Sequence, residues 1–263
     1  MQIAENTLGL HMDLVDYTLH LADDALILGH RNSEWTGHGP ILEQDIAISN
    51  IALDLLGQAR NFYQYAAKLL NEKGNSNITE DTLAYLRTEK DFKNCLLVEQ
   101  TNGDWAKTIL RQFFFSAYQF LLYQQLENSP NVTLAAIAEK SLKEVTYHLR
   151  WASEWVIRLG DGTEESHSRM VNAKEELWGF VEELFQPAAY ESRAFSAGYG
   201  VDVMLLKNEW MSKTKNIFDQ ATLTIPQGRK TETGAKTGGH SENLKNILEE
   251  MQYLQRTYPN CEW

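Results

Sequence analysis

Near the middle of the chain, residues 104–127 read DWAKTILRQFFFSAYQFLLYQQLE. Apolar side chains fall on nearly every side of a helix drawn through it, which is typical of a helix buried all round. Asp104 can cap the start of this helix, and Pro130 closes the polar turn that follows its end. The pattern therefore predicts a buried central helix over 104–127.

Proline residues separate the other predicted helices. The chain has only five prolines, and none falls within 41–129 or within 131–186. Proline inside a helix costs about 3 kcal/mol, so these long proline-free stretches suit long helices. Apolar side chains at three- and four-residue steps predict long helices over 8–31, 41–70 and 132–159, a short one over 80–93, and further helices over 164–185, 202–223 and 241–258.

The order of these helices indicates the fold class. Two long helices, a connector of about thirty residues and two more long helices is the order of a ferritin-like four-helix bundle with one long crossover. No stretch alternates as a strand would. We therefore expect an all-α protein: a ferritin-like four-helix bundle with a long crossover plus additional helices. Residues 1–263 should form a single domain with a C-terminal helical extension.

Composition excludes several classes of partner and location. The chain carries 24 basic and 36 acidic residues, a net charge of −12, which argues against nucleic acid and against an anionic membrane surface. The longest uncharged run, 112–126, is too short and too polar to span a bilayer. The first basic residue is Arg31, so we expect no secretory leader. With only two cysteines, the chain is expected to be soluble and cytoplasmic.

A ferritin-like bundle raises the question of a di-iron site. Such a site needs a carboxylate from each of two helices and a Glu-x-x-His pair from each of the other two. The first helix offers Asp24. The second offers Asp54, with Gly57 where the histidine belongs. The fourth offers Glu144, with His148 one residue late.

The central helix is the decisive one for this question. Between Asp104 and Glu127 it has no Asp, Glu or His, and its polar stripe is Gln112, Ser116 and Gln119. Neutral amides and a hydroxyl are poor substitutes for anionic oxygen around iron. We therefore assign no catalytic, cofactor-binding or metal-binding residue, and interpret six positions as vestigial: Asp24, Asp54, Gly57, Ser116, Glu144 and His148.

Several stretches resemble a known family. They are EWTGHGP (34–40), NIALDLLGQAR (50–60), LVEQTNGDWA (97–106), KEVTYHLR (143–150), RLGDGT (158–163), GGH (238–240) and MQYLQR (251–256). Together they resemble the structural subunits of the phenylacetyl-CoA 1,2-epoxidases, the multicomponent oxygenases of phenylacetate breakdown. Some relatives carry an acid where Ser116 stands, so this departure favours a non-catalytic chain.

The resemblance implies a division of labour. A sister subunit with an intact di-iron site epoxidises the aromatic ring of the CoA thioester, and a reductase with NADPH, flavin and iron–sulfur groups supplies electrons. The chain itself carries no cofactor, and it binds and stabilises the catalytic subunit. Contacts with other epoxidase components and self-association stay open. One alternative is an autonomous di-iron oxygenase or hydroxylase using Asp24, Asp54, Glu144 and His148, and another is an unrelated helical scaffold.

The segment 226–240 concentrates positive charge on an acidic chain, at Arg229, Lys230 and Lys236. Loops are usually polar, so one interpretation is an ordinary solvated loop. The other is a contact arm that docks to the acidic partner or to the phosphates of CoA.

Overall fold

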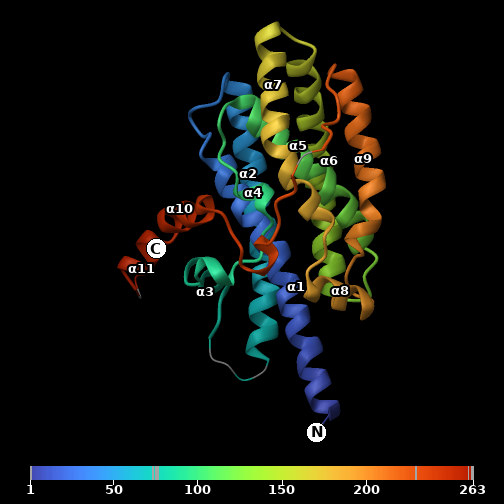
Figure 1. Ribbon diagram of the computed structural model, residues 1–263. Coiled ribbons are helices and arrows are strands. Elements are labelled where there is room, and N and C mark those ends of the chain that lie inside the picture. Colours follow the sequence, from blue (N-terminus) through green and yellow to red (C-terminus); the bar gives the residue numbers. More distant parts are fainter. Residues whose placement is uncertain (1, 73, 75–76, 229, 260, 262–263) are drawn as a thin grey trace.

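The computed structural model describes residues 2–72, 74, 77–228, 230–259 and 261, and within them the regular elements are helices, with no strand (Figure 1). Four long helices run side by side: α1 (Gln2–Ser33), α2 (Leu42–Asn71), α5 (Trp105–Leu126) and α6 (Val132–Gly160). The predicted all-α, ferritin-like fold is confirmed. None of the described helices is both long enough and apolar enough to cross a membrane.

The central helix α5 forms as its sequence predicts. The carboxylate of Asp104 accepts a hydrogen bond from the Lys107 backbone N–H at 3.0 Å and caps the helix. Its apolar residues are buried on all sides because α6, α7 (Glu164–Leu177) and α9 (Val203–Gln220) pack against it. At its outer side, Trp210 of α9 is fully buried and donates its indole N–H to the Phe114 carbonyl at 3.0 Å.

The crossover between α2 and α5 carries short elements of its own. The helix expected over 80–93 is instead α3 (Glu80–Tyr85) followed by a 3-10 turn, η1 (Glu89–Asp91). The turn forms because the Asp91 carboxylate accepts hydrogen bonds from the backbone and hydroxyl of Thr88. The connector then forms one more helical turn, α4 (Leu96–Glu99), which packs on α1.

Two stretches after α6 differ from the prediction. The helix expected over 164–185 ends at Leu177 and continues as two 3-10 turns, η2 (Trp178–Phe180) and η3 (Glu182–Phe185). The stretch expected to be a loop contains α8 (Ala189–Ser196), because the Glu191 carboxylate accepts the Ala188 backbone N–H at 2.7 Å and stabilises its first turn. Asp202 caps α9 as expected.

The C-terminal helix is divided. The expected helix over 241–258 is α10 (Glu242–Met251) and α11 (Tyr253–Thr257), which lie with α3 beside the bundle (Figure 1). The break falls at Gln252, whose buried side chain donates to the carbonyls of Ala84 and Arg87, both at 3.1 Å. These two bonds anchor the extension to the α3 region. At the other end of the chain, α1 begins at Gln2 rather than at residue 8.

Candidate functional site

The polar stripe of α5 lies inside the bundle and is hydrogen-bonded there. Asn32 of α1 donates to Gln112 at 2.7 Å, and Gln112 donates to the Ser116 hydroxyl, also at 2.7 Å. All three side chains are fully buried. Ser116 therefore occupies the interior. Its hydrogen-bond partner is the neutral amide of Gln112, and the same network reaches the buried guanidinium of Arg111, which donates to Asn32 at 3.3 Å.

A second polar chain crosses the interior from α5 to α6. Gln119 donates to the amide oxygen of Gln58 on α2 at 3.0 Å, and to the Tyr123 hydroxyl at the same distance. Gln58 donates in turn to the Glu144 carboxylate at 2.9 Å. Glu144 is only partly buried, so its carboxylate lies where the interior meets the surface.

Asp54 and His148 pair across the seam between α2 and α6. The Nε2 atom of His148 lies 2.9 Å from Oδ2 of Asp54. The His148 side chain is fully buried, whereas that of Asp54 is 37% exposed. One helical turn further along the seam, the indole N–H of Trp151 donates to Gln44 at 3.1 Å. Asp54, Glu144 and His148 are thus each hydrogen-bonded, and the carboxylates of Asp54 and Glu144 lie at the partly exposed seam.

Gly57 is not where the prediction placed it. It is exposed, and a Cβ atom added there would meet nothing within 4 Å. The buried residues of α2 include Ile51, Leu55 and Gln58, and this phase turns position 57 outward. The polar group that α2 contributes to the interior is therefore Gln58, a neutral amide that a search for charged ligands does not find.

Asp24 belongs to a different cluster, on the side of α1 that faces α4 and α8. Its Oδ1 accepts the Cys95 backbone N–H at 2.8 Å, and Oδ2 lies 3.7 Å from Nε2 of His20. Burial raises the pKa of Asp24. The nearby His20 and the hydrogen bond from the Cys95 N–H lower this pKa again, but only in part. No hydrogen bond or ion pair joins Asp24 to Asp54 or His148 among the described residues, so its polar partners differ from theirs.

The donor set of the interior does not fit a di-iron centre. Of the groups that meet there, the carboxylates are those of Asp54 and Glu144, and each already accepts a hydrogen bond from a buried side chain. The α5 positions supply amides and a hydroxyl. Gln112 donates to Ser116 and Gln119 donates to Gln58 of α2, while the buried amide oxygen of Gln119 has no hydrogen-bond partner among the described residues. Iron sites of this class need four carboxylates and two histidines. Within the described part of the chain, no group of three or more His, Cys, Asp or Glu is placed to hold a metal ion.

The loop expected to present positive charge instead binds the body of the protein. Lys236 is 4% exposed, and its ammonium lies 3.1 Å from the carboxylate of Glu191, which is itself 1% exposed. Its charge is therefore used inside the chain, which corrects the interpretation of Lys236 as a surface contact. Lys230 is exposed, and Arg229 lies outside the described residues.

Two further buried carboxylates hold the segment 234–241, which we call the strap. Glu183 accepts the backbone N–H groups of Gly234 and Ala235 at 2.7 and 2.9 Å. Glu99 accepts the Ser241 backbone N–H at 2.9 Å and lies 2.5 Å from Nδ1 of His240. The strap thus crosses from α8 to the crossover, held by three carboxylates from distant parts of the sequence.

The electrostatics of the strap follow from burial and pairing. Burial alone would raise the pKa of Glu191, but the Lys236 ammonium and His20 hold it below its usual value. Burial disfavours a charge on His240, but its hydrogen bond and attraction to Glu99 raise the His240 pKa. Both ring nitrogens of His240 have acceptors, since Nε2 lies 2.9 Å from the Phe92 carbonyl. The strap is therefore fixed by ion pairs that are shielded from water.

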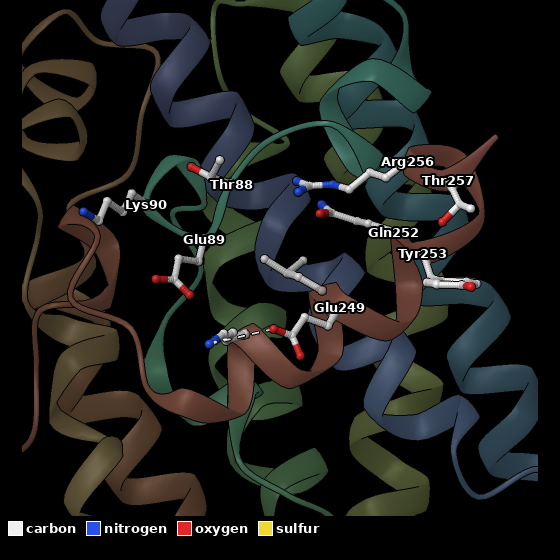
Figure 2. A pocket seen from close by; sticks show the side chains of 10 residues that line it. Thr88, Glu89, Lys90, Glu249, Gln252, Tyr253, Arg256 and Thr257 are labelled. Atoms are coloured by element: carbon white, nitrogen blue, oxygen red, sulfur yellow. Dashed lines mark ion pairs between the residues drawn. The ribbon is translucent and has the colours of Figure 1, made fainter. Parts of the chain in front are cut away.

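Two hollows of about 600 and 610 Å³ lie on the C-terminal extension, away from the bundle interior. The first of them is a groove that runs between η1 and the α10–α11 pair, and Figure 2 shows Glu89 and Lys90 on one side of it and Tyr253 and Arg256 on the other. The guanidinium of Arg256 is already bonded to the carbonyls of Tyr85 and Arg87. Lys245 pairs with Glu249 along the same groove. These charges are of both signs, so the groove has no strong preference for an anion.

Comparison with known proteins supplies a family. The family described as phenylacetic acid catabolic protein matches residues 4–263. The chain is 46% identical over 250 residues to a protein of Escherichia coli (strain K12) whose name describes it as one of the subunits of 1,2-phenylacetyl-CoA epoxidase. That alignment covers 95% of this chain and 99% of the relative.

Proposed function

The chain belongs to the family of phenylacetic acid catabolic proteins, and on that premise we propose that it is the non-catalytic structural subunit of an oxygenase that epoxidises the ring of phenylacetyl-CoA. The name of its relative describes a subunit of such an epoxidase. The observation that carries the non-catalytic role is the bundle interior, where Gln58, Ser116 and Gln119 bond to other side chains of the chain instead of offering anionic ligands.

In this proposal the chemistry belongs to a partner. A catalytic subunit of the same fold would hold two irons, and a reductase with NADPH, flavin and iron–sulfur groups would supply its electrons. This chain would bind the catalytic subunit and keep it folded. Its cysteines are free, with Cys95 buried, which suits the reducing cytoplasm in which we place the complex.

The exposed cation Lys230 stays a candidate contact for the partner, together with Arg229. Lys236 is not a candidate contact because its ammonium is buried against Glu191. The autonomous oxygenase is the weaker alternative, since Asp24 is separate from Asp54 and His148, and α5 supplies no carboxylate.

Reconstitution tests the proposal. We expect no oxidation of phenylacetyl-CoA when the purified chain is mixed with reductase and NADPH. Adding the chain to the catalytic subunit should raise turnover several-fold and keep that subunit soluble. Substrate loss followed by chromatography is the measurement, with catalytic subunit plus reductase as the control. Oxidation by this chain and reductase alone would overturn the proposal in favour of the autonomous enzyme.

A further inference from the structure

The helix α2 is apolar on two sides. Its inner side packs in the core, where Ile48, Ile51 and Leu55 are fully buried. Its outer side carries Leu42, Ile46 and Leu53, which are 71%, 53% and 65% exposed. Because these three are four and seven residues apart, they lie along one line of the helix surface. We call this line the outer α2 face. A helix that is apolar on both sides is normally buried on both sides.

The other long helices have neighbours on their outer sides. Helices α7 and α9 pack against both α5 and α6, and α4 and α8 pack against α1. Apart from α1 and α6, its neighbours in the bundle, α2 has α3 as its main contact among the described elements. That contact lies toward the other end of α2, where Arg60 and Gln64 bond to Glu80. The additional helices therefore leave the outer α2 face open.

The seam beside this face is only partly shielded from water. Asp54 and Glu144 each accept a hydrogen bond from a buried partner, yet both remain partly exposed. Tyr147 of α6 lies three residues after Glu144, so it borders the same seam, and its ring is 39% exposed. A surface laid over α2 and Tyr147 would exclude water from both hydrogen-bonded pairs and strengthen them.

Charge identifies the kind of occupant. Lys140 lies seven residues before Tyr147 on α6, and Arg150 stacks on the Tyr147 ring with its guanidinium 5.8 Å from the ring centroid. Neither cation has a carboxylate partner among the described residues, on a chain with a net charge of −12. An apolar partner surface rimmed by carboxylates would complement this edge. Pairing two copies through the same face would bring together two chains that each carry a net charge of −12, which disfavours self-association.

We propose that the outer α2 face, flanked by Tyr147, Lys140 and Arg150, is the docking surface for the catalytic subunit. The inference rests on the proposed function, and it names the surface that the function leaves unspecified. The outer α2 face extends over about three turns of one bundle helix. Exposed apolar side chains elsewhere form smaller groups, such as Met204 with Leu205 on α9 and Tyr253 with Leu254 on α11, or stand singly, such as Val132 on α6 and Phe195 on α8. Single exposed apolar side chains of that kind are normal on a protein surface.

The test compares two charge insertions in the full chain. Leu53→Asp should weaken binding to purified catalytic subunit at least about tenfold, since it places a carboxylate in the centre of an apolar interface. The matched control Leu205→Asp alters a side chain that is 74% exposed on α9, and it should change the Kd less than about twofold. Circular dichroism melting of each free variant should match the parent. If Leu53→Asp fails to fold, the double truncation Ile46→Ala with Leu53→Ala replaces it.

The outcomes separate this inference from the proposed function. If the unmodified chain does not bind the catalytic subunit, the proposed function fails. If it binds and a folded Leu53→Asp variant binds equally well, the docking surface alone is overturned. Light scattering tests whether a second copy of this chain covers the face instead. Should Leu53→Asp split a self-associated form yet keep its affinity for the catalytic subunit, the face belongs to a second copy and the proposal is wrong.

Discussion

Replacing Lys236 with methionine should lower the free energy of unfolding by about 3–5 kcal/mol, the range found when one partner of a buried ion pair is removed. The ammonium lies 3.1 Å from the Glu191 carboxylate, and both side chains are almost completely buried. Without it, Glu191 keeps its backbone bond to Ala188 and its neighbour His20, but it loses the nearest positive charge. The strap should loosen, and α8 with it.

Chemical denaturation followed by circular dichroism measures this effect. The matched control is Lys230→Ala, which removes an exposed cation from the same loop and should change stability by less than about 0.5 kcal/mol. The double variant Lys236→Met with Glu191→Gln should lose less than the sum of the single changes, because neither charge is then left unpaired. Equal stability of Lys236→Met and Lys230→Ala would show that Lys236 is not buried in solution.

Replacing His148 with alanine should harm the fold more than the chemistry. His148 is fully buried and bonds to Asp54 at 2.9 Å, so truncation leaves a cavity and removes the hydrogen bond. Losses of these kinds together cost about 2–3 kcal/mol. Turnover per folded complex should stay within about twofold of the parent, because His148 contacts no reacting group in the proposed function.

The measurement pairs a denaturation curve with turnover normalised to assembled complex. His167→Ala serves as the turnover control, since His167 bonds to the Gly160 carbonyl at the far end of α6 and should leave turnover unchanged. If His148→Ala abolished turnover while melting temperature and complex formation were unchanged, a direct chemical role for His148 would have to replace the structural one.

The long helices can be predicted because one periodic pattern determines each of them. In α2, α5 and α6 the spacing of the apolar residues shows directly which side of the helix is buried. The predicted and observed bounds of these three helices therefore differ by only about one residue. The helix α8 is not predictable in this way because its first turn depends on Glu191, and the break at Gln252 depends on carbonyls near α3. Contacts between distant residues leave no local pattern.

Some residues of the candidate site can likewise be predicted from the sequence, and others cannot. Ser116 and His148 can be placed in the interior from helical spacing alone. Sequence spacing assigns Gly57 to the interior because it lies three residues after Asp54, as a metal-binding histidine would. The apolar residues of α2 instead place Gln58 in the interior. The carboxylates that hold the strap, Glu99, Glu183 and Glu191, cannot be recognised, because in sequence each resembles an ordinary surface acid. Their partners in the strap lie between 45 and 142 residues away.

The iron content of the purified chain tests the central claim most directly. We expect elemental analysis of the chain, separated from its catalytic partner, to find well below one iron per chain, because the interior offers amides and a hydroxyl where iron needs carboxylates. Growth with added iron should not change this, and Glu144→Gln should leave the content as low. Two irons per chain, lost on Glu144→Gln, would contradict the non-catalytic role.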